Sequence, residues 1–133
     1  MSLEDRPAAI DAELVKNFVI AGHRDVETVK TMLEAEPGLL NASWDWGGGD
    51  FETALEGAAH VGQREIAHYL IEKGARVTIC TAAMLGKLET VKQMITAFPV
   101  LKNATGGHGI PLMAHAKAGG EQAADVVAYL ESL

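Results

Sequence analysis

Apolar residues recur three or four positions apart in several short segments of the chain, with polar residues between them. In residues 26–35 the recurring apolar side chains are Val26, Val29, Met32 and Leu33. This spacing places them on one face of an α-helix, and Pro37 ends the run because proline does not continue a helix. The pattern predicts a short amphipathic helix followed by an extended loop.

The same segment occurs a second time, 62 residues further along the chain. Ten of the seventeen residues in 26–42 are identical to their equivalents in 88–104, among them the pairs Met32/Met94 and Pro37/Pro99. A match of this extent indicates an internal repeat. Internal repeats are typical of proteins built from stacked supersecondary units.

A third unit, residues 53–75, indicates the kind of repeat. Its landmarks, in order, are Thr53-Ala54-Leu55-Glu56, Ala58-Ala59, Gly62 and Gly74-Ala75. This order resembles the ankyrin repeat, in which a Thr-Pro-Leu-His opening, paired alanines and glycine ends mark two short helices. The resemblance implies an all-α fold, an α-solenoid of stacked helix pairs forming one domain over residues 1–133, with repeats at roughly 8–42, 53–77, 78–104 and 110–133. In this register we expect a core that includes Leu55, Ala59, Ile66, Leu70, Val91 and Ile95.

The chain departs from the ankyrin pattern in two ways. Glu56, Cys80 and Met113 stand where the family usually has histidine. Equivalent second-helix positions are also unevenly spaced, with 38 residues from Leu33 to Ile71 and 24 from Ile71 to Ile95. Because the helices cannot absorb this difference, we expect irregular or shortened finger loops. The finger after the first repeat should be enlarged and the next one almost absent.

The composition and net charge of the chain argue against some classes of binding partner. The chain is 48% hydrophobic but only 5% aromatic, and 11 basic against 18 acidic residues give a net charge of −7. No Lys/Arg cluster suits nucleic acid or a membrane surface, so we expect neither as a partner. Without an 18-residue apolar run or a signal-like start, a cytoplasmic location is expected. The single cysteine, Cys80, excludes an internal disulfide and a multi-cysteine zinc site.

The enlarged finger holds the most unusual stretch, Trp44-Asp45-Trp46 followed by three glycines, Asp50 and Phe51. In one interpretation at least one aromatic ring folds back over the neighbouring helix faces. In the other, a tryptophan is presented as a binding anchor, as at interface hot spots. Both can apply to different rings.

A concave groove is the second expected binding feature. In the ankyrin family the two residues before the closing glycine of each inner helix tend to face the groove, which here gives His60-Val61 and Met84-Leu85 among others. We expect a notch there, flanked by the tryptophan finger and the His108 loop. The alternative is that neighbouring segments cover this apolar strip. The predicted binding residues are Trp44, Asp45, Trp46, His60, Val61, Met84, Leu85 and His108.

The histidines raise the question of a metal. No His-Glu-x-x-His motif occurs, and His115, in place of a packing alanine, is expected to bond a loop carbonyl. The alternative is a transition-metal site made by His108, His115 and Asp45 or Asp50. The prediction is that there is no metal site and no cofactor.

No enzyme motif is found. No serine lies in a nucleophile elbow, and Cys80 is expected to be buried and inert. The glycine clusters lack the lysine of a phosphate-binding loop. The sequence therefore predicts a non-catalytic protein–protein interaction scaffold, a monomer or weak dimer, that binds another protein through its groove and tryptophan finger. The alternative is a small-molecule-binding or hydrolytic protein with a pocket between the Trp44-Trp46 finger and the His108 loop.

Overall fold

The computed structural model describes residues 2–133, within which the chain is mostly helical and forms eight α-helices and one short two-stranded sheet. The predicted domain begins at Met1, which lies outside the described residues. The helices are α1 (Ala12–Gly22), α2 (Val26–Ala35), α3 (Ala54–Val61), α4 (Arg64–Glu72), α5 (Ile79–Met84), α6 (Leu88–Ala97), α7 (Leu112–Ala118) and α8 (Ala124–Glu131). Short 3-10 turns cover Leu3–Asp5, Pro37–Leu39, Pro99–Asn103, Gly107–Gly109 and Gly120–Ala123.

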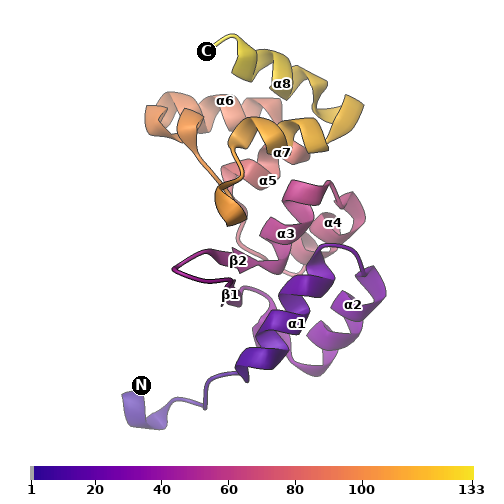
Figure 1. Ribbon diagram of the computed structural model, residues 1–133, viewed down its shortest axis with the longest axis vertical. Coiled ribbons are helices and arrows are strands. Elements are labelled where there is room, and N and C mark those ends of the chain that lie inside the picture. Colours follow the sequence, from indigo (N-terminus) through magenta and orange to yellow (C-terminus); the bar gives the residue numbers. More distant parts are fainter. Residues whose placement is uncertain (1) are drawn as a thin grey trace.

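Consecutive helices pack together, α1 with α2, α3 with α4, α5 with α6 and α7 with α8. The first helices of neighbouring pairs also pack on one another, α1 on α3, α3 on α5 and α5 on α7. The first pair lies toward the N-terminal end of the long axis, the second pair follows it, and the third and fourth pairs lie together toward the C-terminal end (Figure 1). No helix among residues 2–133 has the length and apolar composition that a membrane span requires.

Polar side chains define where several helices begin. Asp25 caps α2 by accepting a hydrogen bond from the Thr28 backbone N–H, at 3.1 Å. At the start of α3, Thr53 and Glu56 form a reciprocal capping box, in which the side chain of each accepts from the backbone N–H of the other. Glu56, which departs from the ankyrin pattern, thus has a clear structural role.

The enlarged loop between the first two helix pairs is a regular hairpin. Strands β1 (Ser43–Asp45) and β2 (Phe51–Thr53) are antiparallel, with Trp44 opposite Glu52. Three successive glycines with positive φ, Gly47, Gly48 and Gly49, make the turn, and Asp45 Oδ1 accepts hydrogen bonds from the backbone N–H groups of Gly47 and Gly49. The hairpin projects from the side of the helix stack, between α1 and α3 (Figure 1).

The predicted core positions are buried. Leu55, Ala59, Ile66 and Leu70 belong to a core cluster around the first two helix pairs, and Val91 and Ile95 belong to a second one around the last two. Residues 73–78, which join α4 to α5, contain no strand, so no hairpin finger separates the second and third helix pairs. Instead, the Arg64 guanidinium donates hydrogen bonds across this junction to the Met84 and Gly119 carbonyl oxygens, at 2.9 and 3.0 Å.

Candidate functional site

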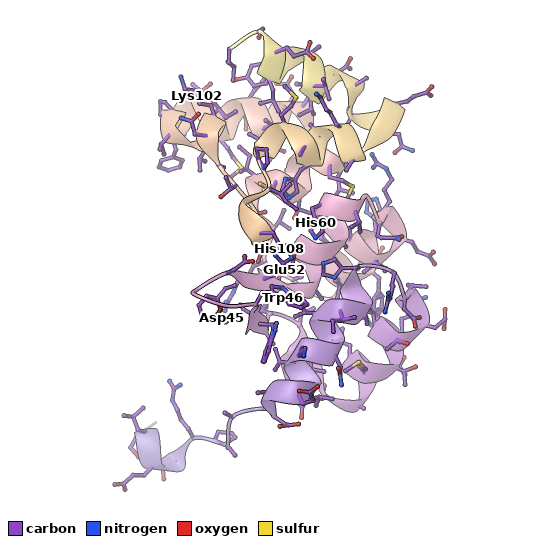
Figure 2. All side chains as sticks on the ribbon, viewed as in Figure 1. Asp45, Trp46, Glu52, His60, Lys102 and His108 are labelled. Carbon is purple, nitrogen blue, oxygen red and sulfur yellow. The ribbon has the colours of Figure 1, made fainter. Side chains whose placement is uncertain are left out.

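Four polar side chains from four different elements converge at the base of the hairpin. His23 follows the end of α1, Glu52 lies in the middle of β2, His60 is in the last turn of α3, and His108 lies in the turn Gly107–Gly109. One potential ligand atom from each of the four lies within 4.8 Å of the other three. Figure 2 shows Glu52, His60 and His108 close together beside the hairpin. We call these four residues the His–Glu cluster.

Glu52 is the buried centre of this cluster. The alternation of β2 leaves Phe51 58% exposed and turns Glu52 inward, where it is 0% exposed. The Trp46 indole N–H donates to Glu52 Oε1 at 3.1 Å. Glu52 Oε2 is buried and accepts no well-directed hydrogen bond from residues 2–133. A buried carboxylate is costly unless positive charge or donors compensate it, so the surrounding imidazoles are needed for its stability.

The distances within the cluster are short. His23 Nε2 lies 3.1 Å from Glu52 Oε1 and 3.1 Å from His60 Nε2. His60 Nε2 lies 3.2 Å from Glu52 Oε2, and His108 Nε2 lies 3.6 Å from Glu52 Oε1. The three imidazoles therefore all direct Nε2 toward the same carboxylate.

The outer nitrogens of two of these rings are held by acceptors. His23 Nδ1 donates to the Val19 carbonyl oxygen at 2.8 Å, and His108 Nδ1 donates to Asp50 Oδ2 at 2.7 Å. Because a carbonyl and a carboxylate can only accept, the proton on each ring is fixed at Nδ1. In the neutral rings, Nε2 then carries the lone pair that faces Glu52.

Asp50 also fixes the backbone that presents His108. Its Oδ1 accepts a hydrogen bond from the His108 backbone N–H at 2.7 Å. His108 has φ 61°, the only positive φ of a non-glycine residue in the described part of the chain. Such a conformation is disfavoured for a side-chain-bearing residue and is found most often at functional sites. The Asp50 contacts hold it in place.

The charges of the cluster are mutually dependent. The hydrogen bond to Glu52 raises the pKa of His23, although partial burial acts in the opposite direction. Burial opposes ionisation of Glu52, but the hydrogen bonds from His23 and Trp46 and the neighbouring imidazole charges hold its pKa below the ordinary value. Burial lowers the pKa of His60. The contact with Glu52 therefore favours the charged form of His23, whereas burial favours the neutral form of His60.

A pocket of about 330 Å³ opens next to the cluster. It is lined by Ile20, His23, Arg24, Trp46, His60 and His108. The Trp46 and His108 rings, with centroids 5.5 Å apart, form an aromatic wall. The two rings are tilted by 51° to each other. The pocket therefore combines aromatic surface with several convergent polar groups, a combination typical of ligand sites.

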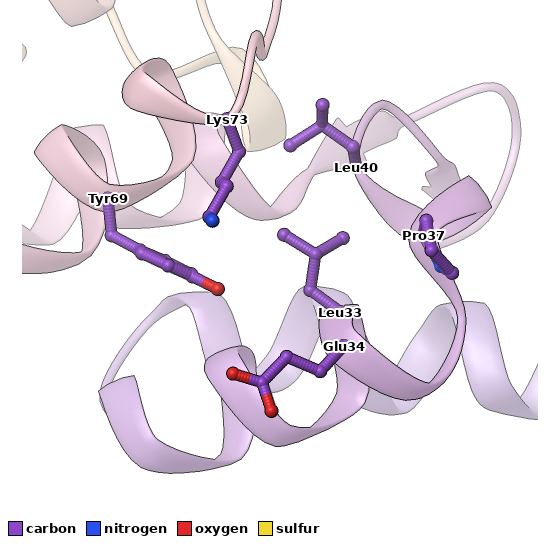
Figure 3. A pocket seen from close by; sticks show the side chains of 6 residues that line it. All are labelled: Leu33, Glu34, Pro37, Leu40, Tyr69 and Lys73. Carbon is purple, nitrogen blue, oxygen red and sulfur yellow. The ribbon is translucent and has the colours of Figure 1, made fainter.

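A second pocket, on the α2 and α4 side, has a different character. Its lining residues are Leu33, Glu34, Pro37, Leu40, Tyr69 and Lys73 (Figure 3). Apart from Glu34, Lys73 and the Tyr69 hydroxyl, these side chains are apolar. Nothing here resembles the convergence of imidazoles on Glu52.

The predicted binding residues are distributed unevenly around the site. Trp46, 37% exposed, and His60 and His108 line the pocket. Trp44 is half-buried, with the Lys16 ammonium of α1 5.8 Å from its ring centroid. Asp45 stabilises the hairpin turn and is not among the residues that line the pocket. Val61, at the end of α3, is 44% exposed and does not line the pocket either.

The expected notch does not open onto Met84 and Leu85. Met84 is fully buried and Leu85 is 8% exposed, both in the first core cluster. The physical reason is the short connection before α5, which lets that helix pack directly on α3 and α7. The alternative interpretation from the sequence, that neighbouring segments cover the apolar strip of the groove, is therefore the correct one for Met84 and Leu85.

The histidines differ in part from expectation. His115 is buried and its Nδ1 donates to the Pro111 carbonyl oxygen at 2.9 Å, which agrees with the structural role expected for it. It is not a member of the four-residue cluster, so the metal site considered with His108, His115 and Asp45 or Asp50 is the wrong set. Asp50 accepts a hydrogen bond from His108 Nδ1, the ring nitrogen that points away from Glu52, and is not itself a member of the four-residue cluster.

Sequence reasoning missed Glu52 and His23 as site residues. For Glu52 a signal was present, since it lies between Phe51 and Thr53 in an alternating segment that turns it to the opposite face. For His23 no local signal exists, because its proximity to His60 depends on how α1 packs on α3.

The resemblance to the ankyrin repeat is carried by the sequence motifs described above. No protein family, curated protein or solved structure matches the chain.

Proposed function

We propose that this protein binds a small molecule in the pocket beside the His–Glu cluster, on an ankyrin-like solenoid of stacked helix pairs. The observation that carries this proposal is the convergence of an aromatic wall, a cation and three imidazoles on one pocket of about 330 Å³. Ligand sites typically span roughly 300–1,000 Å³. A pocket at the low end of this range suits a ligand of about one ring with a short substituent.

The lining residues favour a flat, anionic ligand. The Trp46 and His108 rings offer surfaces on which a planar group can stack. Arg24 is exposed at the rim and forms no salt bridge within residues 2–133. A guanidinium matches the geometry of a carboxylate or phosphate, so Arg24 is the group we expect to hold the ligand's charge.

The test is a binding screen read by tryptophan fluorescence, using small aromatic carboxylates and phosphates. For a compound that binds, Arg24→Ala and His60→Ala should each weaken affinity tenfold or more, since each removes a group facing the ligand. Arg76→Ala removes an exposed arginine outside the pocket and is the matched control. Equal effects of Arg24→Ala and Arg76→Ala, or no binding by any compound in the panel, would contradict the proposal.

A protein-binding scaffold is the second candidate, favoured by exposed apolar side chains on the hairpin and on α3. Phe51, Val61 and Trp46 are 58%, 44% and 37% exposed. Aromatic side chains of this kind anchor protein interfaces, and truncating a hot-spot ring costs roughly 2 kcal/mol or more. Phe51→Ala separates the two candidates, because Phe51 does not line the pocket. It should weaken binding of a protein partner and leave small-molecule affinity unchanged.

A further inference from the structure

We propose that His23, Glu52, His60 and His108 bind one divalent first-row transition metal ion, of which Zn²⁺ is the representative tested below. Three imidazole nitrogens and one carboxylate oxygen form a donor set that suits zinc and its neighbours rather than calcium or magnesium. This inference goes beyond the proposed small-molecule function and does not depend on it.

The separations between donor atoms match a four-coordinate site. Zinc binds imidazole nitrogen at about 2.0–2.1 Å and carboxylate oxygen at about 2.0–2.2 Å, which places neighbouring tetrahedral ligands roughly 3.3–3.5 Å apart. His23 Nε2 lies 3.1 Å from both His60 Nε2 and Glu52 Oε1, His60 Nε2 lies 3.2 Å from Glu52 Oε2, and His108 Nε2 lies 3.6 Å from Glu52 Oε1. All donor pairs lie within 4.8 Å, so only the widest ones have to contract around an ion.

The outer nitrogens of two rings are arranged as they are in metal-binding histidines. Such histidines commonly donate the other ring N–H to a backbone carbonyl or a carboxylate, which orients the ring and fixes the lone pair on the ligand nitrogen. His23 does this through Val19 and His108 does it through Asp50. The neutral rings then direct two Nε2 lone pairs toward the Glu52 carboxylate, an arrangement that is repulsive unless a cation lies between them. A metal ion supplies that cation.

Glu52 gives an independent indication of a ligand. Its carboxylate is fully buried, and Oε2 accepts no well-directed hydrogen bond from the described residues. Buried acceptors are normally satisfied, and an unsatisfied one points to a missing water or ion. Oε1 accepts the Trp46 indole N–H but keeps a second lone pair, so both carboxylate oxygens remain available to a metal.

The experiment is a metal titration of the full chain after removal of bound metal with a chelator. Zn²⁺ should bind with one ion per chain in competition with a chromophoric chelator, and Co²⁺ should give the intense visible absorption of a four-coordinate site. Glu52→Gln and His60→Ala should each weaken Zn²⁺ binding at least 100-fold and abolish the Co²⁺ spectrum. His68→Ala removes an exposed histidine on α4 outside the cluster and should leave both unchanged.

A positioning variant adds a separate readout. Asp50→Asn leaves every ligand in place but weakens the partner of His108 Nδ1, so we expect a 10–100-fold loss of affinity and an altered Co²⁺ spectrum. If circular dichroism shows that Glu52→Gln does not fold, the Zn²⁺ affinity of His108→Ala is measured instead. The His108 side chain is 38% exposed, so we expect this variant to fold. The proposal is overturned by the absence of stoichiometric Zn²⁺ binding, or by wild-type affinity in folded Glu52→Gln or His108→Ala.

Discussion

Replacing Gly107 by alanine tests the geometry of the site without removing any of its polar groups. Gly107 is buried in the turn that carries His108, and a Cβ there would lie 2.6 Å from Glu52 Oε2 and 3.0 Å from Glu52 Cδ. Ordinary contacts of a Cβ begin at 3.4 Å, so the two groups must separate by about 0.8 Å. Glu52 is held by Trp46 and His23, and the loop is therefore the part that has to move.

This movement has two consequences of predictable size. Overpacking of a buried site costs about 1–3 kcal/mol, which urea unfolding followed by circular dichroism will measure as a lower midpoint with an unchanged m-value. Displacing the turn also draws His108 away from Glu52. We expect Zn²⁺ affinity to fall about tenfold or more, as it does when groups that orient metal ligands are disturbed.

The control is Gly120→Ala, which destabilises without touching the site. Gly120 has φ 64° and nothing within 4 Å of an added Cβ, so the variant pays only the cost of a left-handed alanine, about 1–2 kcal/mol. It should keep wild-type metal affinity. The reasoning is refuted if Gly107→Ala retains both stability and affinity, or if the two variants lose affinity equally.

Three further predictions concern the scaffold. Leu70→Ala, at a fully buried core position, should lower the free energy of unfolding by about 2–5 kcal/mol, and a urea-measured loss under about 1 kcal/mol would contradict the assigned core. The hydrogen bonds from Thr28 lower the pKa of Asp25 below 3.8, so this cap stabilises the fold at neutral pH and the stabilisation disappears as the pH falls through the lowered pKa. Thermal melts should therefore show that Asp25→Ala lowers the melting temperature at pH 7 but not in strong acid. An equal loss at both pH values would contradict this role of the cap. Burial raises the pKa of the Cys80 thiol to about 11, so a thiol reagent at pH 8 should react slowly with the native chain and rapidly in denaturant, and equal rates would show an accessible thiol.

The helices and their buried faces could be predicted from the sequence because their signals are local. Apolar spacing identified the faces that carry Leu55, Leu70 and Val91, and all three are buried. The uneven repeat spacing likewise indicated a long loop before α3 and a short one before α5. Each of these inferences needs only the geometry of one helix or the length of one connection.

The site was predicted only in part because it depends on contacts between distant segments. A pocket between the tryptophan finger and the His108 loop was one of the alternatives, but the two other members of the neighbouring His–Glu cluster, Glu52 and His23, were not expected. Met84 failed as a groove residue for a related reason, since a short connection brings its helix against two others. Local spacing does not encode how closely α1, α3 and the turn at His108 approach one another.

Crystals of the full chain grown with Zn²⁺ test most directly whether His23, Glu52, His60 and His108, from four different elements, form one metal-binding site. Anomalous diffraction at the zinc edge should give one strong peak about 2.0–2.1 Å from Nε2 of His23, His60 and His108 and about 2.0–2.2 Å from an oxygen of Glu52. Peaks confined to exposed groups such as His68, with no density inside the His–Glu cluster, would contradict it.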